Sequence, residues 1–143
     1  MAGYMTKLQG YVYNGDHKAG EALTNGLFVE ITANGVKKIT AAGDAVLRVD
    51  AKEKLFGKDA IRLSVVDGGT KDYFFVENEW DDARCCAFNL ADYEVKIGDY
   101  VKMHRLLPGE QLIMSVDSAT YAALAVGDTA KPASGGGIAK ITG

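Results

Sequence analysis

The chain of 143 residues has little cysteine and little proline, with only two of each. Its cysteines, Cys85 and Cys86, are adjacent, whereas the Cα atoms joined by a disulfide usually lie about 5.5–6 Å apart. We therefore expect no disulfide framework, and two free thiols fit a reducing compartment. The sequence also lacks any apolar run of about 18 residues or more, so we expect no transmembrane helix.

A surplus of basic residues is missing as well. The 16 lysines and arginines are outnumbered by 19 aspartates and glutamates, for a formal net charge of −3. Sequence-independent binding to nucleic acid needs positive charge to neutralise phosphates, so we expect no nucleic-acid partner. The first ten residues have neither the basic nor the apolar region of a signal peptide, and we expect no membrane partner either.

Glycine, by contrast, is abundant: there are 17, set among many valine, isoleucine and threonine residues. Glycine among β-branched residues is typical of tight turns between short strands. The clearest turn is Asn34-Gly35, which separates two alternating segments, 27–32 and 36–39. This pattern predicts a hairpin with Asn34 and Gly35 as the two central residues of a type I′ turn.

Alternation of apolar and polar residues continues in segments 45–50 and 61–65. A break at Asp67-Gly68-Gly69 precedes segment 71–77, so we expect 61–65 and 71–77 to form a second hairpin. On the buried faces of the first segments we expect Leu27, Val29, Ile31, Leu47 and Val49.

The C-terminal part continues the β pattern. Leu107-Pro108-Gly109-Glu110 predicts a type II turn, because proline fixes φ and glycine takes the positive φ. We expect this turn to join 100–106 and 112–116 as partner strands. Ser118 is expected to cap a short helix through Leu124, and 138–141 to form the last strand.

These segments predict an all-β fold, mainly antiparallel, as a small barrel or sandwich with one or two short helices. A second short helix or an ordered loop is expected within 80–88, where apolar residues have rough helical spacing. We expect residues 24–143 to form a single β domain with a sub-boundary near 78–92. Residues 1–23 are expected to form an N-terminal arm of irregular structure.

The arm contains aromatic and aliphatic side chains that need burial and that a disordered tail normally lacks. We therefore predict that it becomes ordered on another chain, by adding a strand to a sheet edge or by placing rings in a groove. The alternative is an ordinary first strand of the same domain. The predicted partner-binding residues are Tyr4, Leu8, Tyr11, Val12 and Tyr13.

No combination of residues points to catalysis or metal binding. His17 lies in a polar loop and His104 is expected on the outer face of its strand, and neither has a partner at metal-ligand spacing. The adjacent cysteines lack the two-residue gap of redox and metal-binding pairs. No serine lies in a nucleophile elbow, and the glycines after Ser134 lack the rest of a phosphate-binding loop. We expect no catalytic residue, no metal ligand, no cofactor and no enzymatic activity.

An acidic cluster surrounds the single tryptophan, Trp80. Four carboxylates occur between Glu77 and Asp82, a density that suits Ca²⁺, although the EF-hand spacing is absent and a solvated acidic loop is the simpler interpretation. Trp80 is a candidate surface contact, although a lone tryptophan more often packs on the core of its own domain. The alternative function is therefore a ligand-binding β-module for carbohydrate or host-surface adhesion.

Four C-terminal motifs carry a resemblance: VKIGDYV (95–101), LPGEQL (107–112), LAVGDT (124–129) and GGI (136–138). Together they resemble the small β-proteins that decorate the capsids of tailed bacteriophages, also called cement or head auxiliary proteins. The similarity is best over 95–143, with a fainter match in residues 1–11.

This resemblance implies a structural virion protein, made in the host cytoplasm, that binds the outer surface of an assembled head. Its partners would be the major capsid protein and other copies of itself. A ligand that binds the assembled lattice better than the loose subunits stabilises assembly by that difference. Contact with several subunits strengthens the effect. An enzyme is the weakest alternative, because no nucleophile is paired with a base.

Overall fold

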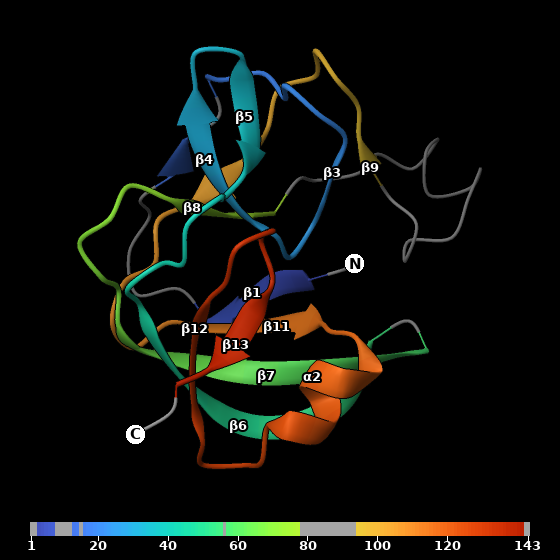
Figure 1. Ribbon diagram of the computed structural model, residues 1–143, viewed down its shortest axis with the longest axis vertical. Helices are drawn as coiled ribbons and strands as arrows, with labels where there is room; N and C mark the ends of the chain where they lie inside the picture. Colours follow the sequence, from blue (N-terminus) through green and yellow to red (C-terminus); the bar gives the residue numbers. More distant parts are fainter. Residues whose placement is uncertain (1–2, 8–12, 15, 56, 78–93, 142–143) are drawn as a thin grey trace.

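The computed structural model describes residues 3–7, 13–14, 16–55, 57–77 and 94–141. Within these residues the chain is mostly antiparallel β-structure with one short helix, and the sheets do not close into a barrel. The expected all-β fold is therefore confirmed in a sandwich-like form. Figure 1 shows one sheet in the lower half of the molecule, a second sheet above it, and the helix at one side.

The larger sheet has six antiparallel strands in the order β1-β11-β7-β6-β12-β13. At its centre is the long β6–β7 hairpin, which pairs from Val46↔Asp67 to Leu55↔Lys58. The strands are β1 (Gly3–Lys7), β6 (Val46–Leu55), β7 (Lys58–Asp67), β11 (Gln111–Ser115), β12 (Thr129–Pro132) and β13 (Ile138–Lys140).

The smaller sheet has five strands in the order β2-β10-β8-β4-β5. They are β2 (Tyr13–Asn14), β4 (Phe28–Thr32), β5 (Gly35–Lys38), β8 (Phe74–Val76) and β10 (Met103–His104). A separate two-stranded ladder joins β3 (Leu23–Thr24) to β9 (Glu94–Val95).

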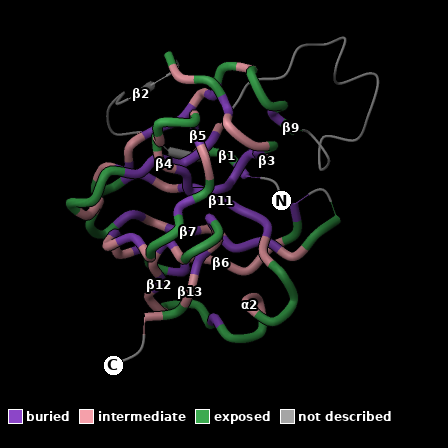
Figure 2. Tube along the Cα trace, turned by 45° about the horizontal axis from the view of Figure 1, so that its top comes forward, coloured by how far each residue is buried: buried purple, intermediate pink, exposed green. Residues whose placement is uncertain are grey.

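The central strands of the smaller sheet are buried on both faces, which explains their continuous apolar runs. Phe28 and Phe75 point into the main core, whereas Val29, Phe74 and Val76 belong to a second core on the other face. Strands that are covered on both sides lose the alternation that marks a half-exposed strand. Figure 2 shows this as buried stretches along β4 and in the layer between the sheets.

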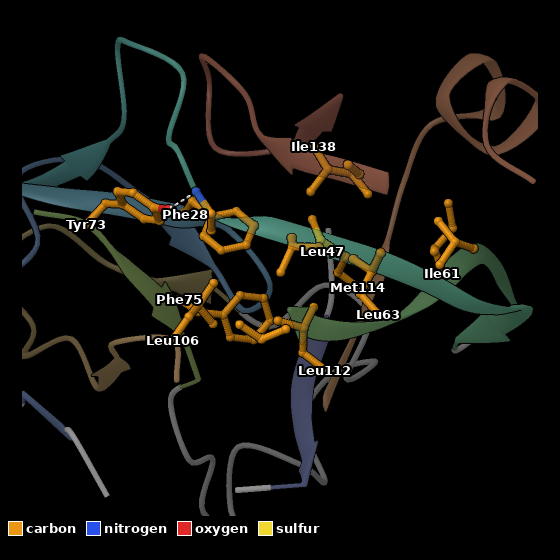
Figure 3. Packing of buried hydrophobic residues seen from close by; sticks show 14 of the residues in the cluster. Phe28, Leu47, Ile61, Leu63, Tyr73, Phe75, Leu106, Leu112, Met114 and Ile138 are labelled. Atoms are coloured by element: carbon orange, nitrogen blue, oxygen red, sulfur yellow. Dashed lines mark hydrogen bonds between the residues drawn. The ribbon is translucent and has the colours of Figure 1, made fainter. Parts of the chain in front are cut away.

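The main core lies between the two sheets. Phe75 meets Phe28 edge-to-face with ring centroids 5.4 Å apart, and Leu47, Leu63 and Leu112 of the larger sheet pack against them (Figure 3). The buried hydroxyl of Tyr73 accepts the backbone N–H of Ala45 at 2.8 Å, which satisfies both polar groups at the rim of this core.

The helix α2 (Ser118–Ala123) begins one residue earlier than expected. Its N-cap is Asp117, whose carboxylate accepts the N–H of Thr120, so the cap assigned to Ser118 was wrong. Aspartate and serine are equally good caps, and the sequence holds both side by side. In the described residues no helix has the length and apolar character needed to span a membrane. The second helix expected within 80–88 lies outside the described residues.

The first hairpin is confirmed, but its turn lies one residue earlier than predicted. Thr32 pairs with Gly35, so Ala33 and Asn34 are the central residues, and Gly35 closes the loop with a φ of 103°. The register places Ile31 near the exposed tip, where it is 40% accessible, instead of on the buried face with Leu27 and Val29. The inward positions of Leu47 and Val49 are confirmed.

Two predicted strand pairings were wrong for one reason. β7 pairs with β6 and β11 rather than with β8, and β10 pairs with β8 and β2 rather than with β11. In each case the intervening turn carries the chain from one sheet to the other. The turn at Leu107–Glu110 has the expected form, with Gly109 at φ 89° and Glu110 N–H donating to the Leu107 carbonyl. Turn chemistry predicts that the chain reverses but not which sheet the next strand joins.

Residues of the N-terminal segment take part in the sheets of this chain. β1 pairs with β11 and β2 pairs with β10, while Leu23 is fully buried in the second core. In the described part of segment 1–23 these pairings replace the irregular structure that was expected. The ordinary first strand, the alternative in the sequence analysis, is what β1 forms.

Candidate functional site

The residues predicted to bind a partner are placed only in part. Tyr4 lies on β1 opposite Ile113, and 37% of it is exposed. Tyr13 pairs with His104 between β2 and β10. The remaining predicted contacts, and the adjacent cysteines, lie outside the described residues: Leu8, Tyr11, Val12, Trp80, Cys85 and Cys86.

His104 is buried, which corrects the expected position on an outer strand face. Only 6% of its side chain is exposed, and its Nε2 lies 3.2 Å from Oε1 of Glu77. The other carboxylate oxygen, Oε2, accepts the N–H of Met5 on β1. Glu77 therefore connects the edge of the larger sheet to the smaller one. In the sequence Glu77 is only the first residue of the acidic cluster. Its contacts could not be predicted, because His104 and Met5 are 27 and 72 positions away along the chain.

The same contacts cover the outer edge of β1. Met5 directs its N–H away from β11 and toward Glu77, and a Cβ on Gly3 would lie 2.7 Å from the Cα of Gly26. Backbone of the segment between β3 and β4 thus packs directly against β1, in a gap that only glycine leaves open. Within the described residues, the Glu77 carboxylate occupies the position beside Met5 that another strand would need.

The edge of β5 is covered too. Val36 exchanges hydrogen bonds with residues 18 and 20, because its N–H donates to the Lys18 carbonyl and its own carbonyl accepts from Gly20. Farther along, the N–H of Lys38 donates to a carboxylate oxygen of Glu21 at 2.7 Å. A backbone segment and an acidic side chain therefore occupy the positions that another strand would need.

The outer side of β13 is different. Gly137 and Ile141 form hydrogen bonds to Ala133 and Thr129, respectively, on the β12 side of the strand. In an antiparallel pair such residues alternate with residues whose N–H and C=O point the other way, which are Ile138 and Lys140. Pro132, the residue opposite Ile138, fits this alternation. A residue at its position does not donate an N–H to β13, and proline has no N–H to donate. Among the described residues no hydrogen bond to these outward groups is found.

Helix α2 stands opposite this open side of β13, so that β13 lies between β12 and the helix in both Figure 1 and Figure 2. Two cavities, of about 310 and 290 Å³, follow one another between helix and strand. We call this space the edge groove; it is lined chiefly by Thr120, Ala119 and Ala123 of the helix, Gly137 of the loop, and Ile138 and Ala139 of the strand.

The two ends of the edge groove carry opposite charges. Asp117 lies at the end where β13 begins, and a hydrogen bond from the Thr120 N–H holds the pKa of its carboxyl below the usual value. Lys140 lies at the other end, half exposed, with its ammonium group 3.2 Å from Asp128. A hydrogen bond from the Ala125 N–H, followed by the interaction with Lys140, lowers the pKa of Asp128.

The outer face of the larger sheet carries a polar network instead of a groove. Asp50 accepts hydrogen bonds from Arg48, Ser64 and Gln111, and Gln111 in turn accepts from Arg62. Burial raises the pKa of Asp50, but the hydrogen bonds from Ser64, Gln111 and Arg48 outweigh it, so the pKa lies below its usual value. Since each member is engaged by another, the network fixes the relative positions of β6, β7 and β11.

Sequence reasoning found the strand at 138–141 and the glycine turn before it, but not the edge groove. Two signals were present: the small residues Ala119, Ala122 and Ala123 on a short helix, and Pro132, which restricts a strand to an edge or a bulge. Neither reveals that helix and strand edge face each other. In the described part of the chain, no group of three His, Cys, Asp or Glu residues is arranged to hold a metal ion.

Comparison of the whole chain with protein-family models, with curated proteins and with solved structures finds no match.

Proposed function

We propose that the protein is a structural decoration protein that binds the outer surface of an assembled bacteriophage head and stabilises its lattice. Two lines support this. The C-terminal motifs resemble those of capsid decoration proteins, and two of them border the edge groove: LAVGDT follows α2 directly and contributes Leu124, and GGI leads into β13 and contributes Gly137 and Ile138.

The observation that carries the proposal is the contrast between the sheet edges. β1 and β5 are covered by contacts within the chain, whereas β13 presents outward N–H and C=O groups beside a groove. Proteins usually cover such edges because they promote association with other chains. A strand edge with outward N–H and C=O groups suits a protein that works by binding another protein.

A decoration protein stabilises a lattice through linkage. If it binds the assembled lattice and not the dissociated subunits, each occupied site contributes RT ln(1 + [L]/Kd), which is about 2.7 kcal/mol when the free concentration is 100 times Kd. Sites repeat over the whole head, so a modest contribution per site becomes a large effect on the particle. Neither catalysis nor a cofactor is required for this activity.

The test is binding of the purified full chain to undecorated heads assembled from the major capsid protein of the same phage. Co-sedimentation should reach saturation at a fixed ratio to capsid subunits, with no binding to unassembled subunits. Decorated heads should also dissociate at a higher temperature or denaturant concentration than bare heads. Binding to loose subunits as strong as to heads, or unchanged head stability at saturation, would contradict the proposal.

A further inference from the structure

We propose that Asn34, at the tip of the β4–β5 hairpin, is a site of spontaneous deamidation in the folded protein, and that Asn25 is not. Asparagine is a thermolabile residue, and a following glycine has no side chain to hinder attack by its backbone nitrogen. The described residues hold two such pairs, Asn25-Gly26 and Asn34-Gly35, and a third, Asn14-Gly15, lies partly outside them. The sequence does not distinguish the pairs, whereas the structure does. This inference is independent of the proposed function.

The reaction uses water as its co-reactant. The backbone nitrogen of Gly35 forms a bond to Cγ of Asn34 and gives up its proton, while the bond between Cγ and the side-chain nitrogen breaks and ammonia leaves. Water then adds to one of the two carbonyl carbons of the resulting succinimide ring, and the bond from that carbon to the ring nitrogen breaks. Opening at Cγ gives aspartate. Opening at the main-chain carbon gives isoaspartate, whose main chain runs through Cβ and Cγ.

Asn34 is exposed and is held only by local contacts. It is one of the two central residues of the turn, and within the described part of the chain its side-chain amide makes no hydrogen bond. Thr32 is the strand partner of Gly35, and its Oγ1 donates to the Gly35 carbonyl at 2.7 Å and accepts the Asn34 N–H at 3.2 Å. Opening at the end of a hairpin exposes little apolar surface and therefore costs little free energy. The Gly35 nitrogen can thus reach Cγ of Asn34 without unfolding of the domain.

Asn25 is held by contacts between distant parts of the chain. Only 4% of it is exposed, and the N–H of Gly26, which would have to attack, donates to the Val76 carbonyl at 2.9 Å. The Cα of Gly26 lies against β1, where a Cβ on Gly3 would come within 2.7 Å of it. Attack by the Gly26 nitrogen requires this hydrogen bond to break and the segment to separate from β1. Larger openings of this kind cost more free energy and are correspondingly rare.

Isoaspartate at position 34 loosens the cover of the β5 edge. The carbonyl oxygen of Asn34 packs against Gly20, since a Cβ on Gly20 would lie 2.2 Å from it. In isoaspartate this carbonyl becomes part of a side-chain carboxylate, and the main chain gains a carbon atom before Gly35. The hydrogen bonds of Val36 with residues 18 and 20, which lie beside this contact, weaken as a result. Ordinary aspartate keeps the main chain and therefore these hydrogen bonds.

Peptide mapping by mass spectrometry tests the choice of site. The full chain is kept at mildly alkaline pH, either folded or unfolded in urea, and conversion of Asn34 and Asn25 is followed with time. In urea the two rates should agree within about threefold, because both residues precede glycine. In the folded protein Asn34 should react at least about tenfold faster than Asn25. Equal rates in the folded protein, or no conversion of Asn34 there while the urea sample reacts completely, would overturn the proposal.

A variant of the turn tests whether its contacts control the rate. Thr32→Val removes the hydroxyl that binds residues 34 and 35 and keeps a β-branched side chain in the strand. It should accelerate conversion of Asn34 about threefold in the folded protein and leave the rate in urea unchanged. The matched control is Thr40→Val, because the exposed Thr40 hydroxyl binds Glu30 and not the turn, so the rate should stay that of the wild type. An unchanged rate in Thr32→Val would contradict control by the opening of the tip.

The isoaspartate form, separated by chromatography, tests the structural consequence. In amide exchange Val36 and Gly20 should lose protection at least about tenfold relative to the fresh protein. Asn34→Asp carries the same charge on an unaltered main chain and should keep that protection within about threefold. Equal loss in both proteins would assign the effect to charge and not to the lengthened main chain. No loss in either would show that the cover of β5 does not depend on the turn, and both results would overturn this step.

Discussion

The closed and open edges of the larger sheet, β1 and β13, lie at opposite ends of the same strand order. β1 has Gly26 and the Glu77 carboxylate packed against its outer side, whereas β13 has a groove and, beyond it, a helix of small residues. Both are short and both pair with one neighbour. What distinguishes them is whether the rest of the chain supplies a partner for the outward backbone groups.

The comparison teaches that an edge can be closed in two ways. On β5 the covering is mostly backbone, from residues 18 to 20, and on β1 it is a close glycine contact together with one carboxylate. The contacts on β1 come from Glu77 and Gly26, which adjoin the smaller sheet, so covering this edge also joins the two sheets. On β13 the outward groups of Ile138 and Lys140 have no hydrogen bond among the described residues, although the carbonyl of Gly136, two residues before the strand, accepts the N–H of Phe28 on β4.

The largest expected effect comes from adding one methyl group at each edge. A Cβ on Gly20 would lie 2.2 Å from the carbonyl oxygen of Asn34, and one on Gly3 would lie 2.7 Å from Gly26, whereas a Cβ on Gly137 meets nothing within 4 Å. Gly20→Ala and Gly3→Ala should each reduce the free energy of unfolding by about 3 kcal/mol, because backbone must move. Gly137→Ala should be neutral or stabilise by up to about 1 kcal/mol.

Urea unfolding at equilibrium measures all three variants. If Gly3→Ala and Gly137→Ala lowered the free energy of unfolding equally, the two edges would be equally packed, and the contrast between them would not hold. A loss at Gly3 without a change in the slope of the unfolding curve would localise the effect to packing rather than to the denatured state.

The second-largest expected effect is the loss of stability when the Glu77 carboxylate, which covers β1, is removed. Glu77→Ala leaves the Met5 N–H and buried His104 without their acceptor and should cost about 2 kcal/mol of stability. The matched change at β5 is Glu21→Ala, whose hydrogen bond to Lys38 is exposed and which should cost less than about 1 kcal/mol. Chemical denaturation compares the two. A cost for Glu21→Ala equal to that for Glu77→Ala would show that burial of the acceptor is not what matters.

Hydrogen exchange sharpens the comparison without any substitution. The amides of Met5 and Lys38 point outward from edge strands but have carboxylate acceptors, whereas those of Ile138 and Lys140 have none among the described residues. Met5 and Lys38 should therefore exchange at least about tenfold more slowly than Lys140 in the isolated protein. Slow exchange at Lys140 in the isolated chain would contradict an open edge.

The sequence predicted local features better than long-range ones. The hairpin at residues 28–38, the turn at Gly109 and the last strand are confirmed because each depends on residues close together in the chain. The partner strands of β7 and β10 were wrong because alternation is the same whichever sheet a strand joins. His104 shows the same limit, since the residue that holds it, Glu77, is a neighbour only after the two sheets pack.

The edge groove illustrates why the candidate site was out of reach. Its two walls, α2 and β13, are both evident in the sequence, and Pro132 even indicates an edge. Helix and strand lie beside each other because the chain returns from the helix to pair β12 with β6 and only then turns into β13. No local sequence pattern predicts that course of the chain. Of the aromatic N-terminal residues predicted to bind a partner, Tyr4 lies on β1, which pairs with β11 of the same chain, and Tyr13 lies on β2, which pairs with β10.

The smallest expected effect is acid loosening of the strand beside the groove. Asp128 accepts the Ala125 N–H and pairs with Lys140, and its pKa is lowered by the first and then by the second. A carboxyl group whose folded pKa is depressed contributes stability that is fully present above its ordinary value, about 4, and is lost as the pH falls through the lower, folded value. The Ala125 amide should therefore exchange faster, relative to its intrinsic rate, as the pH drops below about 4. Asp128→Asn should abolish that dependence, while the Val36 amide on the β5 edge, whose acceptor is the backbone carbonyl of Lys18, keeps its protection over the same range. Equal acid sensitivity at Val36 and Ala125 would mean that acid opens both sheets together, and the edges would then not be independent.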